Sequence, residues 1–101
     1  MTKVVFRPAA QRDLESIATF IAKRNPPRAD TFCQEIIDLC QSLDEMPTRG
    51  APRDDLAEGL LMLVHKKKYL IFYDYHEATD QIEILRVTQG SRLLPKMKIR
   101  K

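Results

Sequence analysis

The fold is decided by YLIFY at residues 69–73 and IEILRV at residues 82–87, two short stretches near the C-terminal end of the chain. Both are too short for a surface helix and rich in β-branched or aromatic residues, so each predicts a β-strand. The segment between them, residues 74–81, is polar enough to form a turn. Together they predict an antiparallel hairpin, which is followed by a basic segment.

Two further apolar runs lie upstream and also predict strands. Residues 60–64 (LLMLV) form one run, and residues 65–68 (HKKK) make a tight basic turn from it into the strand at 69–73. Residues 3–6 (KVVF) predict a first strand near the N-terminus. Because strands close in sequence usually pair, the last three strands should form an antiparallel meander.

The chain between the first two predicted strands carries two helical patterns. The first is an apolar stripe at i, i+3, i+4, i+7 and i+8, made of Leu14, Ile17, Ala18, Ile21 and Ala22. Asn25 and the two prolines after it end this helix and begin a second one, since asparagine is a good N-cap and proline suits a first helical turn. The second stripe comprises Ala29, Phe32, Cys33, Ile36, Ile37, Cys40 and Leu43. The short connection predicts antiparallel neighbours.

These elements predict an α+β fold with the order β-α-α-β-β-β, in which the N-terminal helical hairpin packs on one face of a small antiparallel sheet. The length of 101 residues predicts a single domain over residues 1–101, with residues 92–101 as a basic C-terminal tail. The chain carries neither an apolar run long enough to span a bilayer nor a secretory signal, so we expect a cytoplasmic protein without a membrane partner. Cys33 and Cys40 lie about two helical turns apart, beyond the reach of a disulfide, and should be reduced core residues.

The charge is distributed unevenly. The formal net charge is +3, yet residues 92–101 hold five basic side chains and no acidic one, so the rest of the chain carries a net negative charge. A basic tail predicts an anionic partner, either nucleic acid or an acidic protein segment. The alternative is a solvated terminus that only keeps the protein soluble.

Strand alternation gives a first candidate for a binding residue, Arg86. Residues 82, 84, 86 and 88 should share one face of the last strand, and residues 83, 85 and 87 the other. Leu85 and Val87 are the better core candidates, so Arg86 should project from the open face. An arginine held on a rigid strand can bind phosphate or carboxylate. The alternative is an intramolecular pair with Glu58, Glu83 or the C-terminal segment.

The sequence contains no strong catalytic motif. The glycines are scattered, and the two histidines, His65 and His76, lie in different turns without metal-ligand spacing, so neither a cofactor nor a metal is expected. His65, beside Lys66, Lys67 and Lys68, could act as a general acid or base, or could be a solvated turn residue. The tyrosines at 69, 73 and 75 share one strand face, where they could stack on bases or form the edge of the core.

Residues spread over the chain carry a family resemblance. They are Asp13-Leu14 with Ile17 and Ile21, Asn25-Pro26, Leu56, Gly59 and Leu60, the YLIFY and IEILRV strings, and Gly90. This pattern, which runs from Phe6 to about Arg92, resembles the ParE branch of the RelE/ParE superfamily, the toxins of type II toxin–antitoxin pairs. The resemblance implies two N-terminal helices on a small antiparallel sheet, in agreement with the elements expected from periodicity.

The resemblance also implies a function and its partners. It implies a bacterial toxin that a cognate, ParD-like antitoxin neutralises through an acidic or amphipathic segment. ParE proteins target DNA gyrase and stall its cleavage complex with DNA, without chemistry of their own. RelE proteins use the same fold as ribosome-dependent mRNA endonucleases, a mechanism that needs a positioned acid and base and cations to neutralise the phosphorane.

The residues fit the ParE mode better. Residues 88–96 contain no tyrosine or histidine, and arginine is a poor proton shuttle because it stays protonated. We therefore expect a protein-binding toxin with Arg86 and Arg92 on its functional face and residues 65–68 adding charge. Gln89 and Leu93 stand where many ParE-like chains have a histidine and an acid, which leaves the target open. The alternatives are a RelE-like nuclease, with His65 and the three lysines as its catalytic groups, and an inert toxin that only binds its antitoxin.

Overall fold

The computed structural model describes residues 2–90, and both predicted helices are present in it. Helix α1 spans Pro8–Ala22 and helix α2 spans Pro26–Gln41, followed by a short 3-10 turn at Ser42–Asp44. A proline occupies the first turn of each helix, where a missing N–H costs nothing. Asn25 caps α2, since its Oδ1 accepts a hydrogen bond from the Arg28 N–H at 3.3 Å. Neither helix combines the length and hydropathy that crossing a membrane requires.

Five strands form the sheet of residues 2–90: β1 (Lys3–Phe6), β2 (Ala51–Pro52), β3 (Leu61–His65), β4 (Tyr69–His76) and β5 (Gln81–Gln89). Their order is β1-β5-β4-β3-β2. The meander of β3, β4 and β5 is antiparallel, as predicted, whereas β1 pairs with β5 in parallel. The sheet is therefore mixed, and the predicted antiparallel sheet is corrected in this respect. The helical hairpin after β1 supplies the crossover that a parallel pairing requires.

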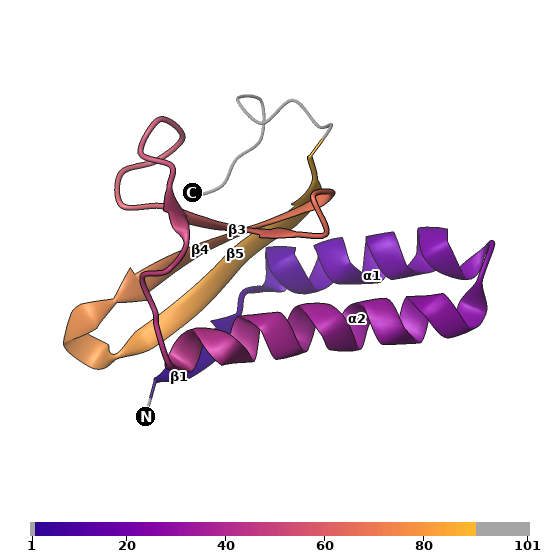
Figure 1. The fold of residues 1–101 in the computed structure, drawn as a ribbon, viewed down its shortest axis with the longest axis horizontal. Helices are drawn as coiled ribbons and strands as arrows, with labels where there is room; N and C mark the ends of the chain where they lie inside the picture. Colours follow the sequence, from indigo (N-terminus) through magenta and orange to yellow (C-terminus); the bar gives the residue numbers. More distant parts are fainter. Residues whose placement is uncertain (1, 91–101) are drawn as a thin grey trace.

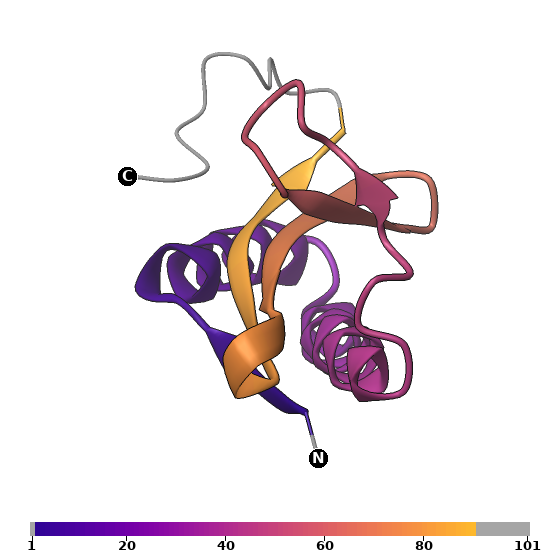
Figure 2. The same cartoon turned by 90° about the vertical axis from the view of Figure 1, so that its left-hand side faces the viewer.

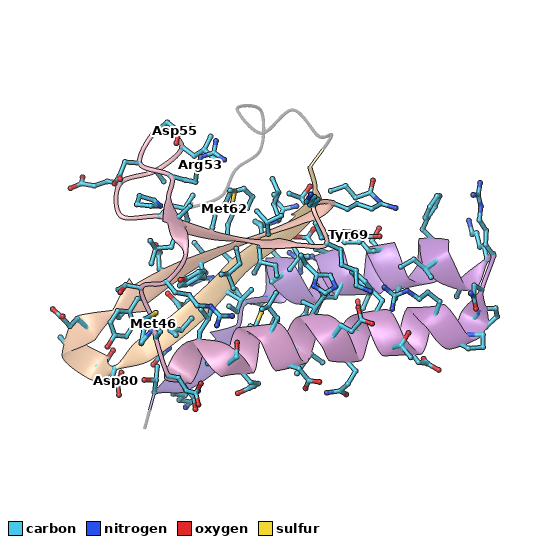
Figure 3. All side chains as sticks on the ribbon, viewed as in Figure 1. Met46, Arg53, Asp55, Met62, Tyr69 and Asp80 are labelled. Atoms are coloured by element: carbon cyan, nitrogen blue, oxygen red, sulfur yellow. The ribbon has the colours of Figure 1, made fainter. Side chains whose placement is uncertain are left out.

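The two helices cover one face of the sheet, which confirms the α+β architecture (Figure 1). Figure 2 shows β1 beside the end of the β4–β5 hairpin, so the N-terminal strand closes one edge. The other edge is the two-residue strand β2, which was not predicted. On the face away from the helices lies the segment that contains Arg53 and Asp55 (Figure 3).

A β-bulge in β5 changes which residues face the helices. Phe72 pairs with Arg86 and Tyr73 with Ile84, so Leu85 has no cross-strand partner of its own. The extra residue shifts the alternation, as bulges do. Ile82, Ile84 and Val87 consequently share the helix-facing core, while Leu85 lies on the opposite face. The prediction that Leu85 and Val87 share a core face, with Ile82 and Ile84 opposite, is wrong for this reason.

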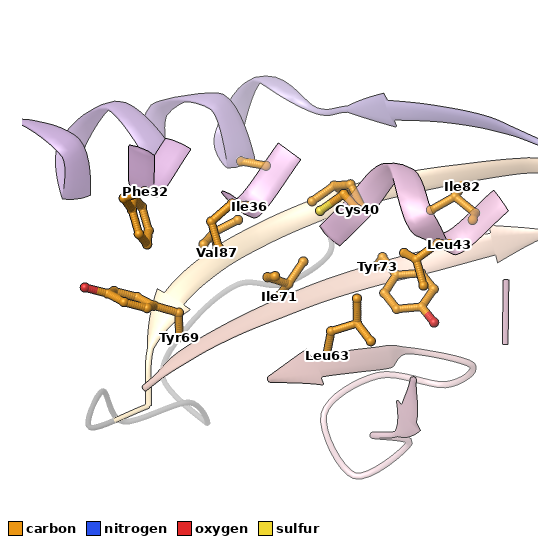
Figure 4. Close-up of a cluster of buried hydrophobic side chains, with 12 residues drawn as sticks. Phe32, Ile36, Cys40, Leu43, Leu63, Tyr69, Ile71, Tyr73, Ile82 and Val87 are labelled. Carbon is orange, nitrogen blue, oxygen red and sulfur yellow. The ribbon is translucent and has the colours of Figure 1, made fainter. Parts of the chain in front are cut away.

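The main core lies between α2 and the sheet (Figure 4). Phe32, Ile36 and Cys40 of α2 are fully buried against strand residues that include Ile71 and Tyr73. Burying one such aliphatic or aromatic side chain stabilises the fold by about 1.5–3 kcal/mol. The tyrosines of β4 contribute to this core or pack at its edge, so the core-edge interpretation of them is confirmed. A second, smaller cluster of Leu60, Phe72 and Leu85 lies on the other face.

Both cysteines are free thiols, as predicted. Cys40 is buried, and burial raises the pKa of its thiol to about 12. Cys33 is half-buried on the same helix, and burial also raises its pKa. Neither thiol therefore forms a reactive thiolate near neutral pH.

Candidate target-binding site

The basic turn between β3 and β4 has an unusual backbone. Lys66 and Lys67 adopt φ angles of 52° and 57°, and the Lys68 N–H donates to the His65 carbonyl at 3.1 Å. Two central residues with positive φ define the tight hairpin turn that Asn-Gly normally occupies. A non-glycine residue in this region costs about 1–3 kcal/mol. Strain of this kind, at two adjacent lysines, points to a functional reason for keeping them.

The lysine side chains of the turn are largely accessible. Lys66 is 59% exposed and lies 3.5 Å from a Glu35 carboxylate oxygen, a distance at which a surface pair contributes little. Lys68 places its Nζ 5.4 Å from the centre of the Tyr69 ring. Lys67 is exposed at the tip. Three neighbouring, exposed lysines thus lie at one end of the hairpin.

His65 is packed, which excludes the interpretation as a solvated turn residue. Its side chain is 15% exposed and lies against the rings of Phe32 and Tyr69, with ring centroids 6.5 and 6.4 Å away. Its Nε2 lies 3.0 Å from Glu35 Oε1. The imidazole therefore links β3 to α2.

Glu35 is the acidic centre of this end of the molecule. The Arg28 guanidinium donates to both of its carboxylate oxygens, at 2.7 and 3.2 Å. The hydrogen bonds from Arg28 and, after it, from His65 lower the pKa of Glu35 to about 2. One carboxylate thus faces Arg28, His65 and Lys66, so the surface around the turn remains cationic. Sequence reasoning missed Glu35, because a single acid on the polar side of a helical stripe carries no signal.

Arg86 does not project from the open face. Its Nε and Nη2 donate to Asp13 Oδ2 and Oδ1 of α1 at 2.7 and 2.9 Å. The prediction of an open-face arginine is wrong because β1 pairs with β5 only as far as Ile84, which leaves the next residues of β5 as an edge where Asp13 binds the Val87 N–H and the guanidinium. An intramolecular pair was expected as the alternative, but with a different acid. Asp13, Arg86 and Phe20 line a pocket of about 330 Å³ between α1 and β5.

The end of β5 returns to the basic turn. Gly90 N donates to the Lys68 carbonyl at 2.7 Å, and Tyr69 pairs with Gln89. The structure therefore brings residues 65–68 together with the last described residues of the chain, while Arg86 lies against α1. Arg92 and the rest of the predicted basic tail lie outside the described residues.

A second surface lies on the helical hairpin. Side chains of β1, α1 and α2 line an apolar groove of about 500 Å³, namely Phe6, Gln11, Leu14, Glu15, Ala18, Cys33, Ile37 and Gln41. Strand β1, which contributes Phe6, is also an edge of the sheet. A groove beside a strand edge can accept an amphipathic helix or an added strand.

Comparison with known proteins gives a matching family and several solved structures of similar fold. The family model described as "ParE toxin of type II toxin-antitoxin system, parDE" matches residues 4–94. No curated protein matches the chain in sequence.

The first structure is from the chromosomal ParDE toxin–antitoxin system of P. aeruginosa. Its sequence is 21% identical to this one, and the match covers 88% of this chain and 96% of that chain, with a TM-score of 0.75. The second is from the toxin–antitoxin complex RelBE2 of Mycobacterium tuberculosis, at 23% identity, 87% and 96% coverage and a TM-score of 0.67. At these identities both show a shared fold.

Proposed function

The chain belongs to the ParE family of type II toxins, and from this membership we propose that it inhibits DNA gyrase by binding and that a cognate antitoxin neutralises it. The observation that carries the proposal is the β3–β4 turn. Two lysines occupy backbone positions that glycine would fill without strain, and both side chains are exposed. A rigid cationic tip fits an anionic surface, such as the DNA held in a gyrase cleavage complex.

The groups near the turn support binding rather than chemistry. The His65 ring is packed and its Nε2 meets Glu35, and Glu35 is held ionised by Arg28. Arg86 is held by Asp13, so in this proposal it positions β5 against α1 and does not contact the target. The target-binding residues are then Lys66, Lys67 and Lys68, with His65 as their support and Arg92 as a further basic residue.

The ribosome-dependent nuclease is the second candidate, and one contact favours it. The 3.0 Å pair of His65 and Glu35 lies beside Lys66, which together could move a proton and stabilise a phosphorane. In a nuclease the His65 imidazole would have to reach an RNA hydroxyl, yet Phe32 and Tyr69 largely cover the ring, so the side chain would have to move out. Gyrase binding requires no movement of His65.

Pulse labelling separates the two candidates. The toxin is expressed without antitoxin, and DNA and protein synthesis are followed separately over the first minutes. The gyrase proposal predicts an early loss of DNA synthesis while translation continues. An early loss of translation would replace it with the nuclease. If neither falls, the chain is an inert toxin and the proposal is wrong.

The helical groove and the β1 edge support the antitoxin half of the proposal. An antitoxin segment with apolar residues on one face would fill the groove beside Ala18 and Cys33, and could continue along β1. Ala18→Glu places a charge in the groove and should abolish neutralisation while leaving growth inhibition unchanged. Thr19→Glu, an exposed neighbour outside the groove, is the matched control. Neutralisation of Ala18→Glu at the same antitoxin level as the control would contradict this placement.

A further inference from the structure

Asp74, His76 and Glu83 bring three potential metal ligands together on the β4–β5 hairpin. One ligand atom of each lies within 4.8 Å of the others, and among residues 2–90 no other trio of histidine, cysteine or acidic side chains is this close. The His76 Nε2 lies 2.7 Å from Glu83 Oε1. Asp74 pairs directly with Glu83 across the strands. The trio crosses from β4 to β5, which is why the chain spacing shows no metal motif.

The arrangement places two carboxylates face to face. Like charges directly opposite on neighbouring strands destabilise a sheet, so a cation beside them is favourable, and Arg7 already provides one on the Oε2 side of Glu83. Arg7 Nη1 holds Glu83 Oε2 at 3.1 Å, while Oε1 faces the imidazole. Arg7 thus holds Glu83 Oε2, while Glu83 Oε1 lies on the side of His76.

We propose that Asp74, His76 and Glu83 form a zinc site. One imidazole and two carboxylates are ligands that Zn²⁺ accepts, whereas Mg²⁺ prefers oxygen ligands alone. Ligand atoms on one tetrahedral zinc lie about 3.3 Å apart, so the His76–Glu83 pair has to open by about half an ångström. The His76 side chain is 47% exposed, so the imidazole is free to move on its solvent side. Arg7 serves as the outer partner that orients Glu83.

Three protein ligands leave a fourth zinc position for water or for a side chain of a binding partner. The metal would join β4 to β5 next to Arg7, the residue that precedes α1. Zinc should therefore stabilise the hairpin end and its junction with the first helix. The inference does not rest on the gyrase proposal, because the site lies at the end of β4 away from the β3–β4 turn.

The other histidine supplies a matched control. His65 also contacts a glutamate, at 3.0 Å, but Arg28 and Lys66 crowd that carboxylate and the described residues bring no third ligand to it. His65→Ala should therefore leave zinc binding unchanged. The Cys33 thiol is another group that could bind zinc, and Cys33→Ser tests whether it does.

The experiment is a calorimetric titration of the purified chain with ZnCl₂, with MgCl₂ in parallel. The proposal predicts one zinc per chain, no magnesium binding, and a loss of affinity of about tenfold or more in both His76→Ala and Asp74→Asn. Zinc should raise the melting temperature of the wild type and of His65→Ala, but not of His76→Ala. Circular dichroism shows whether each variant is folded, and both changed side chains lie outside the core.

Three results would overturn the proposal. The first is the absence of zinc binding by the wild type. The second is wild-type affinity in both folded variants, His76→Ala and Asp74→Asn. The third is a cobalt-substituted protein with a thiolate charge-transfer band that Cys33→Ser removes, which would place the metal on the cysteine.

Discussion

Arg86 and Asp13 join the last strand to the first helix through two parallel hydrogen bonds, Nε to Oδ2 at 2.7 Å and Nη2 to Oδ1 at 2.9 Å. Asp13 Oδ2 also accepts the Val87 N–H at 2.9 Å. The two side chains are 26% and 16% exposed, so the pair is largely withdrawn from water. The hydrogen bond to Asp13 raises the pKa of Arg86, which remains a cation. This pair is a structural tie between α1 and β5.

Asp13→Ala should lower the free energy of unfolding by about 2–3 kcal/mol, because it leaves the Arg86 guanidinium and the Val87 N–H without this acceptor. Arg86→Lys should cost less, since it keeps the charge and loses the two-pronged geometry. Urea unfolding of both variants measures the difference. Equal free energies of unfolding for Asp13→Ala and the wild type would show that the Arg86–Asp13 pair does not stabilise the fold.

Charge reversal at the two candidate arginines should separate their roles. Arg86→Glu sets a carboxylate beside Asp13 and should prevent accumulation of folded protein. Arg92→Glu should leave the fold intact and weaken growth inhibition, if Arg92 contacts the target. Soluble yield and circular dichroism report folding, and colony formation reports inhibition. Full toxicity of a folded Arg92→Glu variant would remove Arg92 from the target-binding residues.

Gly50 is required by a close contact with a buried tyrosine. A Cβ at this position would lie 2.7 Å from Tyr73 Oη and 2.9 Å from its Cε1. The Tyr73 hydroxyl accepts the Gly50 N–H at 3.0 Å and donates to the Pro47 carbonyl at 2.9 Å, so the ring has little freedom to move. Gly50→Ala should destabilise the protein by about 1–3 kcal/mol. Gly90→Ala, whose Cβ would meet only the Lys68 carbonyl at 3.4 Å, is the control that should stay near wild type in thermal unfolding.

Glu35 should make the stability acid-sensitive in a defined range. Its pKa falls from the ordinary 4.5 to about 2 in the folded chain. A depressed carboxyl pKa stabilises the folded state above pH 4.5, and this contribution is lost as the pH falls towards 2. The stability difference between the wild type and Glu35→Gln should therefore be constant above pH 5 and shrink between about pH 4.5 and 2. Urea unfolding across this range measures it, and a pH-independent difference would rule out the ionised pair as its cause.

Periodicity was sufficient for the helices, the meander and most of the core. The apolar stripe of α2 predicts the burial of Phe32 and Ile36, and the alternation in β4 predicts that Tyr69 and Tyr73 share a face. The helix-facing residues of β5 could not be predicted, because a single extra residue at Leu85 changes the alternation without leaving a local sign in the sequence.

Contacts between residues far apart in the chain could not be predicted from the sequence either. The partner of Arg86 lies 73 residues away along the chain, and the parallel pairing of β1 with β5 depends on how the helical hairpin crosses the sheet. Both belong to the tertiary fold, whereas the basic turn at 65–68 is local and was predicted directly.

Replacing the strained lysines by Lys66→Asn and Lys67→Gly should stabilise the hairpin. Asn-Gly adopts the positive φ angles of this turn without the steric cost that lysine carries, so the free energy of unfolding should rise by about 1 kcal/mol. Thermal unfolding measures the change. A melting temperature below that of the wild type would show that the lysine side chains stabilise the turn.

The same double variant tests the central claim most directly, in a cleavage assay with purified gyrase and supercoiled DNA. Its control is Arg12→Gln with Lys23→Gln, which removes two exposed charges from α1 and its C-cap. The account predicts that the wild type and the control accumulate cleaved DNA, and that the better-folded Asn-Gly variant does not. Equal cleavage by the Asn-Gly variant, or no cleavage by the wild type, would contradict it.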